Sequence, residues 1–194
     1  MISGTSLVFF GLTVVYCFIM KEPLGIFGLN VYMLTIGVGT GRWAKELTLP
    51  YVYLIPEKSW KKLFHILREQ IPSLVVESVV CFLPVCFILK LNIAEVFAMI
   101  LARISFGFLF IGINLILQRF AGSKNKKFIV ITVYFLLIAL FSAPSVAAAF
   151  IMNMYMPFYM AFTYLAMAVV NVPLSLIILL CCRNILEYAD YNNK

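Results

Sequence analysis

The chain has 194 residues, of which 64% are hydrophobic and only 12% are charged. A water-soluble domain has about 45–50% apolar and about 25% charged residues, so this composition excludes an ordinary soluble enzyme and a disordered chain. The net charge of +7 would suit a nucleic-acid-binding protein, but in a membrane protein it indicates basic cytoplasmic loops. We therefore expect an integral membrane protein with no nucleic-acid partner and no room for a separate ATPase or kinase domain.

Six apolar runs divide the chain, each close to the roughly 20 residues that a helix needs to cross the hydrocarbon core. In chain order we expect membrane helices over residues 3–20, 24–41, 71–91, 93–117, 128–150 and 157–181. The chain is thus predicted to be an all-α polytopic membrane protein, with a single transmembrane domain over residues 1–194. The longest polar stretch, residues 42–70, separates the second run from the third.

The basic residues are distributed unevenly over the predicted connections. Residues 42–70 contain six Lys or Arg, residues 119–127 contain four, and the polar tail 183–194 contains two. The connections on the other side contain only Lys21 and Lys90. Because cytoplasmic loops carry an excess of Lys and Arg, this bias predicts that all three basic segments and both chain ends are cytoplasmic.

Within the loop 42–70, the sequence predicts an amphipathic helix over residues 56–70. Pro56 suits the first helical position, where a missing N–H leaves no donor unpaired. Apolar residues at i, i+3, i+4 and i+7 would form one stripe, which consists of Trp60, Leu63, Phe64 and Leu67. The neighbouring basic residues are Lys61, Lys62 and Arg68. Such a helix either lies on the inner leaflet in contact with membrane lipid or docks its stripe into a groove of a cytosolic partner.

The residues around this helix also carry a family resemblance. Residues Glu46–Pro56 read ELTLPYVYLIP, Lys61–Leu63 follow as KKL, and Glu77 comes in the next helix. This segment resembles the E-L-x-x-P-Y-I-Y-L-I-P…K-L pattern of ABC exporter membrane proteins, which belong with the type-2 ABC exporter permeases. The resemblance extends over about residues 25–125 and is strongest over residues 46–63.

The resemblance implies a permease of the bacterial plasma membrane that has no ATPase activity of its own. Helix 56–70 would be the coupling helix that contacts a separate cytosolic ATPase, and two permease subunits, identical or different, would form the path. The chain would bind no cofactor, while ATP and Mg would be held by the ATPase. The implied docking residues are Trp60, Lys61, Lys62, Leu63, Phe64, Leu67 and Arg68. A peptide, a lipid or a drug-like substrate would suit such a bundle equally.

Polar residues inside the apolar runs are candidates for a path across the membrane. They are Glu77, Arg103, Asn114 and Asn171. A charge at a helix centre costs about 2.5–3.5 kcal/mol on insertion scales, so Glu77 and Arg103 are expected either to pair within the bundle or to line a substrate path. Asn114 and Asn171 are expected to form hydrogen bonds between helices.

Two other functions stay open on the sequence. His65 and Cys81 would supply the dyad of a membrane-embedded cysteine peptidase that processes a signalling propeptide. Because sixteen residues separate them, their proximity would require a re-entrant loop. An ion-coupled secondary transporter would instead use Glu77, Glu95 and Arg103 as ion or proton sites, although no internal repeat is visible. No metal site is expected, because no carboxylate or cysteine cluster stands at ligand spacing around His65.

Overall fold

The computed structural model describes residues 4–40, 58–120, 127–156 and 159–182. Within these residues the chain forms helices and no strand, so the prediction of an all-α polytopic membrane protein is confirmed. The helices are α1 (Gly4–Met20), α2 (Pro23–Thr40), α5 (Ser59–Leu89), α6 (Ile93–Phe120), α7 (Lys127–Tyr155) and α8 (Met160–Cys182). Most of the loop 42–70, including the motif Glu46–Pro56, and the tail 183–194 lie outside the described residues.

Each predicted apolar run corresponds to one helix, but the helices differ in length. Four are long and apolar enough to cross a membrane, over Trp60–Leu89, Ile93–Leu117, Val130–Tyr155 and Met160–Cys182. The apolar parts of α1 and α2 are shorter and cover Leu7–Met20 and Pro23–Val38. The four long helices alone establish a multi-pass arrangement.

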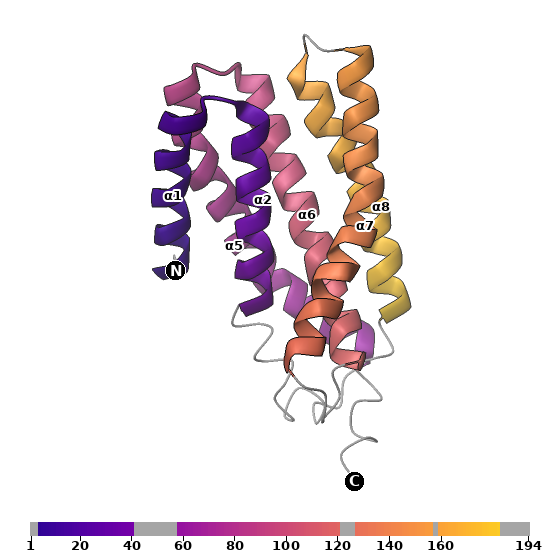
Figure 1. The fold of residues 1–194 in the computed structure, drawn as a ribbon. Coiled ribbons are helices and arrows are strands. Elements are labelled where there is room, and N and C mark those ends of the chain that lie inside the picture. Colours follow the sequence, from indigo (N-terminus) through magenta and orange to yellow (C-terminus); the bar gives the residue numbers. More distant parts are fainter. Residues whose placement is uncertain (1–3, 41–57, 121–126, 157–158, 183–194) are drawn as a thin grey trace.

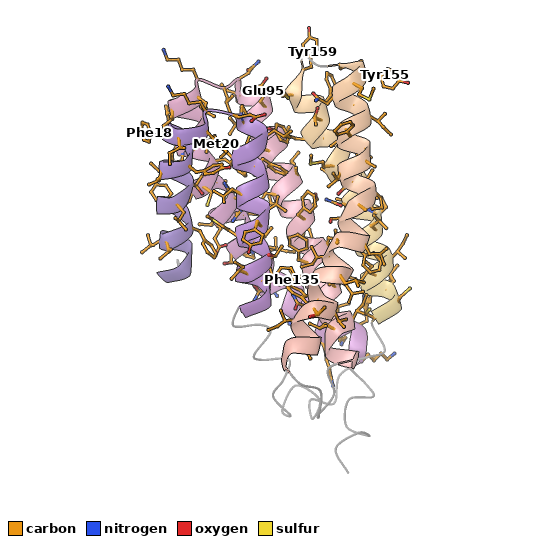
Figure 2. The ribbon with its side chains drawn as sticks, viewed as in Figure 1. Phe18, Met20, Glu95, Phe135, Tyr155 and Tyr159 are labelled. Carbon is orange, nitrogen blue, oxygen red and sulfur yellow. The ribbon has the colours of Figure 1, made fainter. Side chains whose placement is uncertain are left out.

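The six helices form an up-and-down bundle with two unlike ends (Figure 1). Short connections join α1 to α2, α5 to α6 and α7 to α8 at one end, which we call the short-loop end. The opposite end, where α2 and α6 stop and α5 and α7 begin, is the long-loop end. Figure 2 shows Tyr155 and Tyr159 at the short-loop end, and both side chains are exposed, as expected for aromatic residues at a membrane interface.

α6 is the central helix of the bundle. It packs against α2, α5, α7 and α8, and 67% of the residues in its apolar 18-residue stretch are buried. Glycines permit this close packing: a Cβ at Gly112 would lie 2.8 Å from Cγ2 of Ile178 on α8, and one at Gly107 would lie 3.0 Å from the Leu74 side chain on α5. Small residues allow membrane helices to approach closely where van der Waals packing holds them together.

The predicted helix 56–70 is not a separate element, which corrects the sequence analysis. From Ser59 it continues without a break into the third apolar run, so α5 has 31 residues. At 1.5 Å per residue α5 is about 46 Å long, which exceeds the roughly 30 Å hydrocarbon core. α5 is therefore longer than one upright crossing of the hydrocarbon requires. Pro72 lies inside the helix, as membrane helices tolerate.

Candidate functional site

The first turns of α5 carry every residue that the sequence predicted for docking. Leu63 is only 2% exposed, and Leu67 is partly buried and packs against the hydrophobic core. Lys62 is buried as well. The chain's own bundle thus covers Lys62 and Leu63 and part of Leu67, while the contact of these residues with a partner ATPase stays a prediction.

The other edge of the same stripe is exposed. Trp60 is 52% exposed and Phe64 is 61% exposed, and the basic residues Lys61 and Arg68 are exposed too. Successive helical residues are about 100° apart, so Phe64 points away from Leu63 although both belong to one apolar stripe in the sequence. We call Trp60, Lys61, Phe64 and Arg68 the exposed α5 face.

Arg103, on α6, faces α5. Its Nη1 donates a hydrogen bond to Oγ of Ser78 at 2.9 Å, and Ser78 in turn donates to the Leu74 carbonyl at 2.6 Å. Glu77 interacts electrostatically with Arg103 and accepts a hydrogen bond from Ser73 at 3.4 Å. The Arg103 side chain is buried, and its Nε has no hydrogen-bond partner in the described part of the chain. Arg103 therefore links two helices of the bundle and is shielded from lipid.

Asn114, also on α6, is linked to two further helices. Its Nδ2 donates to the Phe110 carbonyl at 3.1 Å and to the Tyr134 hydroxyl at 3.4 Å. The Tyr134 hydroxyl donates to the Thr35 carbonyl at 2.9 Å, so one chain of hydrogen bonds joins α6, α7 and α2. The sequence analysis missed Tyr134, because it is one of 10 tyrosines and no local pattern distinguishes it.

Asn171, on α8, is buried against α6. Its Nδ2 donates to Oγ of Ser105 at 3.4 Å, and Ser105 donates to the Ala102 carbonyl at 2.7 Å. Its Oδ1 has no partner among the residues described. Of the four predicted path residues, Glu77 and Arg103 interact between α5 and α6, Asn114 joins α6 to α7, and Asn171 joins α8 to α6. Their role in a substrate path stays a prediction.

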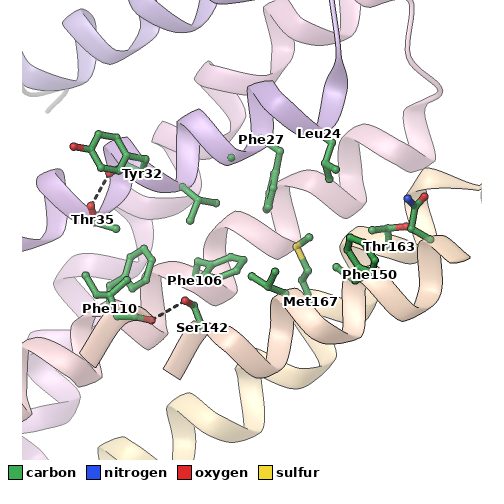
Figure 3. Close-up of a pocket in the computed structure, with 16 residues that line it drawn as sticks. Leu24, Phe27, Tyr32, Thr35, Phe106, Phe110, Ser142, Phe150, Thr163 and Met167 are labelled. Atoms are coloured by element: carbon green, nitrogen blue, oxygen red, sulfur yellow. Dashed lines mark hydrogen bonds between the residues drawn. The ribbon is translucent and has the colours of Figure 1, made fainter. Parts of the chain in front are cut away.

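A groove of about 420 Å³ lies between α2 and α7, with α6 and α8 forming its floor. Figure 3 shows Phe27, Phe106, Phe110 and Met167 among the apolar side chains that line it. The sequence analysis did not predict this groove. Its lining comes from four helices that lie far apart in the sequence, and apolar periodicity does not show which helix faces meet.

The proposed peptidase dyad is excluded by the helix that carries it. His65 and Cys81 both lie on α5, which is continuous from Ser59 to Leu89. Sixteen residues of helix separate them by about 24 Å along the axis. A histidine must be within hydrogen-bond reach of the cysteine that it activates, so these two residues do not form a nucleophile–base pair.

The charged residues proposed for ion-coupled transport do not converge either. Glu95 lies in the first turn of α6, at the short-loop end (Figure 2). Arg103 is eight residues further along, or about 12 Å down the helix axis. Within the described residues there is also no group of three or more His, Cys, Asp or Glu side chains that could hold a metal ion.

Comparison with known proteins gives one family and no individual relative. No curated protein and no solved structure matches the chain. A family model described as "Putative ABC exporter" matches residues 1–189, which is nearly the whole chain. This match confirms the resemblance that the motif around residues 46–63 indicated, and it agrees with the multi-pass helical bundle. The chain therefore belongs to the putative ABC exporter family and is a membrane component of an ABC transport system.

Proposed function

We propose that the chain is the permease subunit of an ABC exporter and that it engages a cytosolic ATPase through the exposed α5 face. Membership of the family implies association with an ATPase in general, and α5 supplies a candidate contact surface. The termini and the long-loop end would be cytoplasmic, as the distribution of basic residues predicts. A second permease subunit would complete the path.

The observation that carries this proposal is the pair of exposed aromatic side chains on α5. Trp60 and Phe64 lie one helical turn apart in the first turns of α5, and both are more than half exposed. Lys61 and Arg68 flank them. Aromatic anchors surrounded by basic residues are typical of an interface core, where Trp, Tyr and Arg contribute most of the binding energy.

α5 is also suited to transmit a movement. The turn that carries Trp60 and Phe64 is anchored by Leu63 to the hydrophobic core, and the same helix reaches the buried contact between Ser78 and Arg103. Because the helix is continuous, a displacement of its exposed end is passed to the centre of the bundle without an intervening loop. ATP-driven closure of the partner would act on the permease through this helix.

The experiment compares two pairs of variants in the chain purified with its ATPase from the native host. The double variant Trp60→Ala and Phe64→Ala should weaken ATPase binding at least about 30-fold, as truncation of interface hot spots does. Ile131→Ala is the matched control, because Ile131 is an exposed apolar residue near the same end of α7. Co-purification and the ATPase rate of the complex are measured for each variant.

A second control uses Leu63, which lies on the same turn as Phe64 but is buried in the bundle. Leu63→Ala should lower the stability of the isolated chain, because Leu63 packs inside the bundle. The aromatic double variant should leave that stability unchanged. Full ATPase binding by the aromatic double variant would contradict docking through the exposed α5 face.

A further inference from the structure

The groove between α2 and α7 extends along both helices. Its lining runs along α2 from Leu24 to Thr35, a distance of about 16 Å, and along α7 from Ile138 to Asn153. Its volume of about 420 Å³ lies in the usual range for small-molecule sites.

The lining carries no Asp, Glu, Lys or Arg among the residues described. Phe27, Phe106 and Phe110 dominate it, and Figure 3 shows them along its length. A charged group would lose its hydration there without gaining a counter-charge, at a large cost in free energy. The part of a ligand that enters this groove is therefore uncharged and mostly apolar.

Of the polar side chains in the groove, Thr35 and Ser142 donate to carbonyls of their own helices, whereas the short-loop end has a polar group without a partner within the described ranges. Thr163 lines the groove there, is only 2% exposed, and its Oγ1 has no hydrogen-bond partner in the described part of the chain. Asn153 lines the same groove from the last turn of α7. A buried hydroxyl without a partner is destabilising, so the structure leaves a hydrogen bond at this position for a ligand to make.

The polar end and the apolar body match the orientation of an amphiphile in a bilayer. Thr163 is in the first turn of α8 and Asn153 in the last turn of α7, so both lie towards the short-loop end and the membrane interface. The apolar part extends towards the middle of the bundle, where the hydrogen bond from Tyr134 to Thr35 ties α7 to α2. A lipid-like molecule would keep its polar group near the interface while its chain fills the groove.

We propose that this groove binds an amphiphile whose polar group is uncharged and hydrogen-bonds Thr163. If the proposed export function holds, this chemistry names the substrate class: a lipid-like molecule rather than a charged peptide. The binding site itself does not depend on an ATPase partner, so the two proposals can fail separately.

Gly28 offers a clean way to fill the groove. It lines the groove on α2, and a Cβ added there would meet no other atom within 4 Å. Gly11 on α1 is the matched control, because a Cβ there is equally unobstructed and Gly11 does not line the groove. Gly28→Phe should block the groove, whereas Gly11→Phe should leave it free, and both variants should keep the fold.

The probe is a photoreactive fatty alcohol with a diazirine in its chain, applied to the full chain in nanodiscs, with labelled residues mapped by mass spectrometry. We expect labelling of the α2 and α7 residues that line the groove, its loss in Gly28→Phe, and no change in Gly11→Phe. A fatty acid probe of equal chain length should label the groove less, because its carboxylate finds no counter-charge there.

Thr163→Val tests the polar end without filling space. It should weaken labelling by the alcohol about fivefold, the effect of one hydrogen bond. It should also leave the unliganded chain as stable as before or more stable, because the hydroxyl that it removes has no partner. Thr13→Val is the control: the Thr13 hydroxyl donates to the Phe9 carbonyl at 2.8 Å, away from the groove, so its loss should not affect labelling.

Three outcomes would overturn the proposal. In the first, the alcohol labels the whole lipid-facing surface evenly. In the second, a photoreactive phospholipid labels the groove and excess alcohol does not displace it, so that the groove holds bulk lipid only. In the third, Gly28→Phe converts a dimer into a monomer in light-scattering measurements, so that a second copy of the chain occupies the groove. In each of these cases, co-purification of an ATPase with the chain would still support the export function, so the two proposals are tested separately.

Discussion

α6 and α7 have nearly the same mean hydropathy, 2.2 and 2.3, yet 67% of the residues in the apolar 18-residue stretch of α6 are buried and only 11% of those in the corresponding stretch of α7. In a bilayer, hydropathy determines which segments leave water. It does not determine which of them pack inside the bundle, because lipid tails are as apolar as a leucine side chain. What distinguishes α6 is its small and polar residues: Gly107 and Gly112 allow close contact, and Arg103 and Asn114 bond to other helices. The centre of this bundle is therefore specified by packing and hydrogen bonds.

The largest expected effect comes from truncating matched leucines on the two helices. Leu109 on α6 is completely buried, whereas Leu140 on α7 is 62% exposed. Leu109→Ala leaves a cavity and should lower the free energy of unfolding by about 2–5 kcal/mol. Leu140→Ala faces lipid and should change it by less than about 0.5 kcal/mol. Unfolding of the purified chain by SDS, followed by far-UV circular dichroism, measures both; equal effects would contradict the contrast between the helices.

A smaller effect is expected from closing the gap that glycine leaves between α6 and α8. Gly112→Ala places a Cβ 2.8 Å from Cγ2 of Ile178, so one helix must shift, which should cost about 1–3 kcal/mol. Gly11→Ala makes the same change where nothing lies within 4 Å, and should be neutral or stabilising. The same SDS titration applies. Ile178→Ala removes Cγ2 and should therefore cost less stability in the Gly112→Ala background than it does alone. An equal cost in both backgrounds would show that the contact with Ile178 is not the cause of the loss.

The smallest effect concerns the polar link that ties α7 to the centre. Tyr134→Phe removes the hydroxyl that accepts from Asn114 and donates to the Thr35 carbonyl. Hydrogen bonds between membrane helices average about 0.6 kcal/mol in double-mutant cycles, so the coupling between Tyr134→Phe and Asn114→Leu should be of that order. A coupling of zero would show that α7 is held by packing alone.

The sequence predicted most of the helices because apolar composition sets where a chain enters the membrane. The run 93–117 became α6 (Ile93–Phe120), and 24–41 became α2 (Pro23–Thr40). The main error was to separate residues 56–70 from the third run. The hydropathy falls before residue 71, but a fall in hydropathy does not end a helix. α5 is continuous from Ser59 to Leu89, with Pro72 inside it.

The candidate site was harder to predict than the fold. Periodicity correctly placed Trp60, Leu63 and Phe64 near one side of a helix, but burial of Leu63 and exposure of Phe64 depend on which neighbour covers the stripe. The groove depends even more on tertiary structure. Thr163 has no sequence signal at all, because its role follows from the absence of a hydrogen-bond partner in the folded bundle.

The most direct test of the exporter assignment is to purify the chain from its native host in a gentle detergent and identify its partners by mass spectrometry. The account predicts recovery of a P-loop ATPase with the chain, lost in the Trp60→Ala and Phe64→Ala double variant and retained in Ile131→Ala. Recovery of the chain alone, under conditions that keep a known ABC transporter of the same host intact, would contradict it.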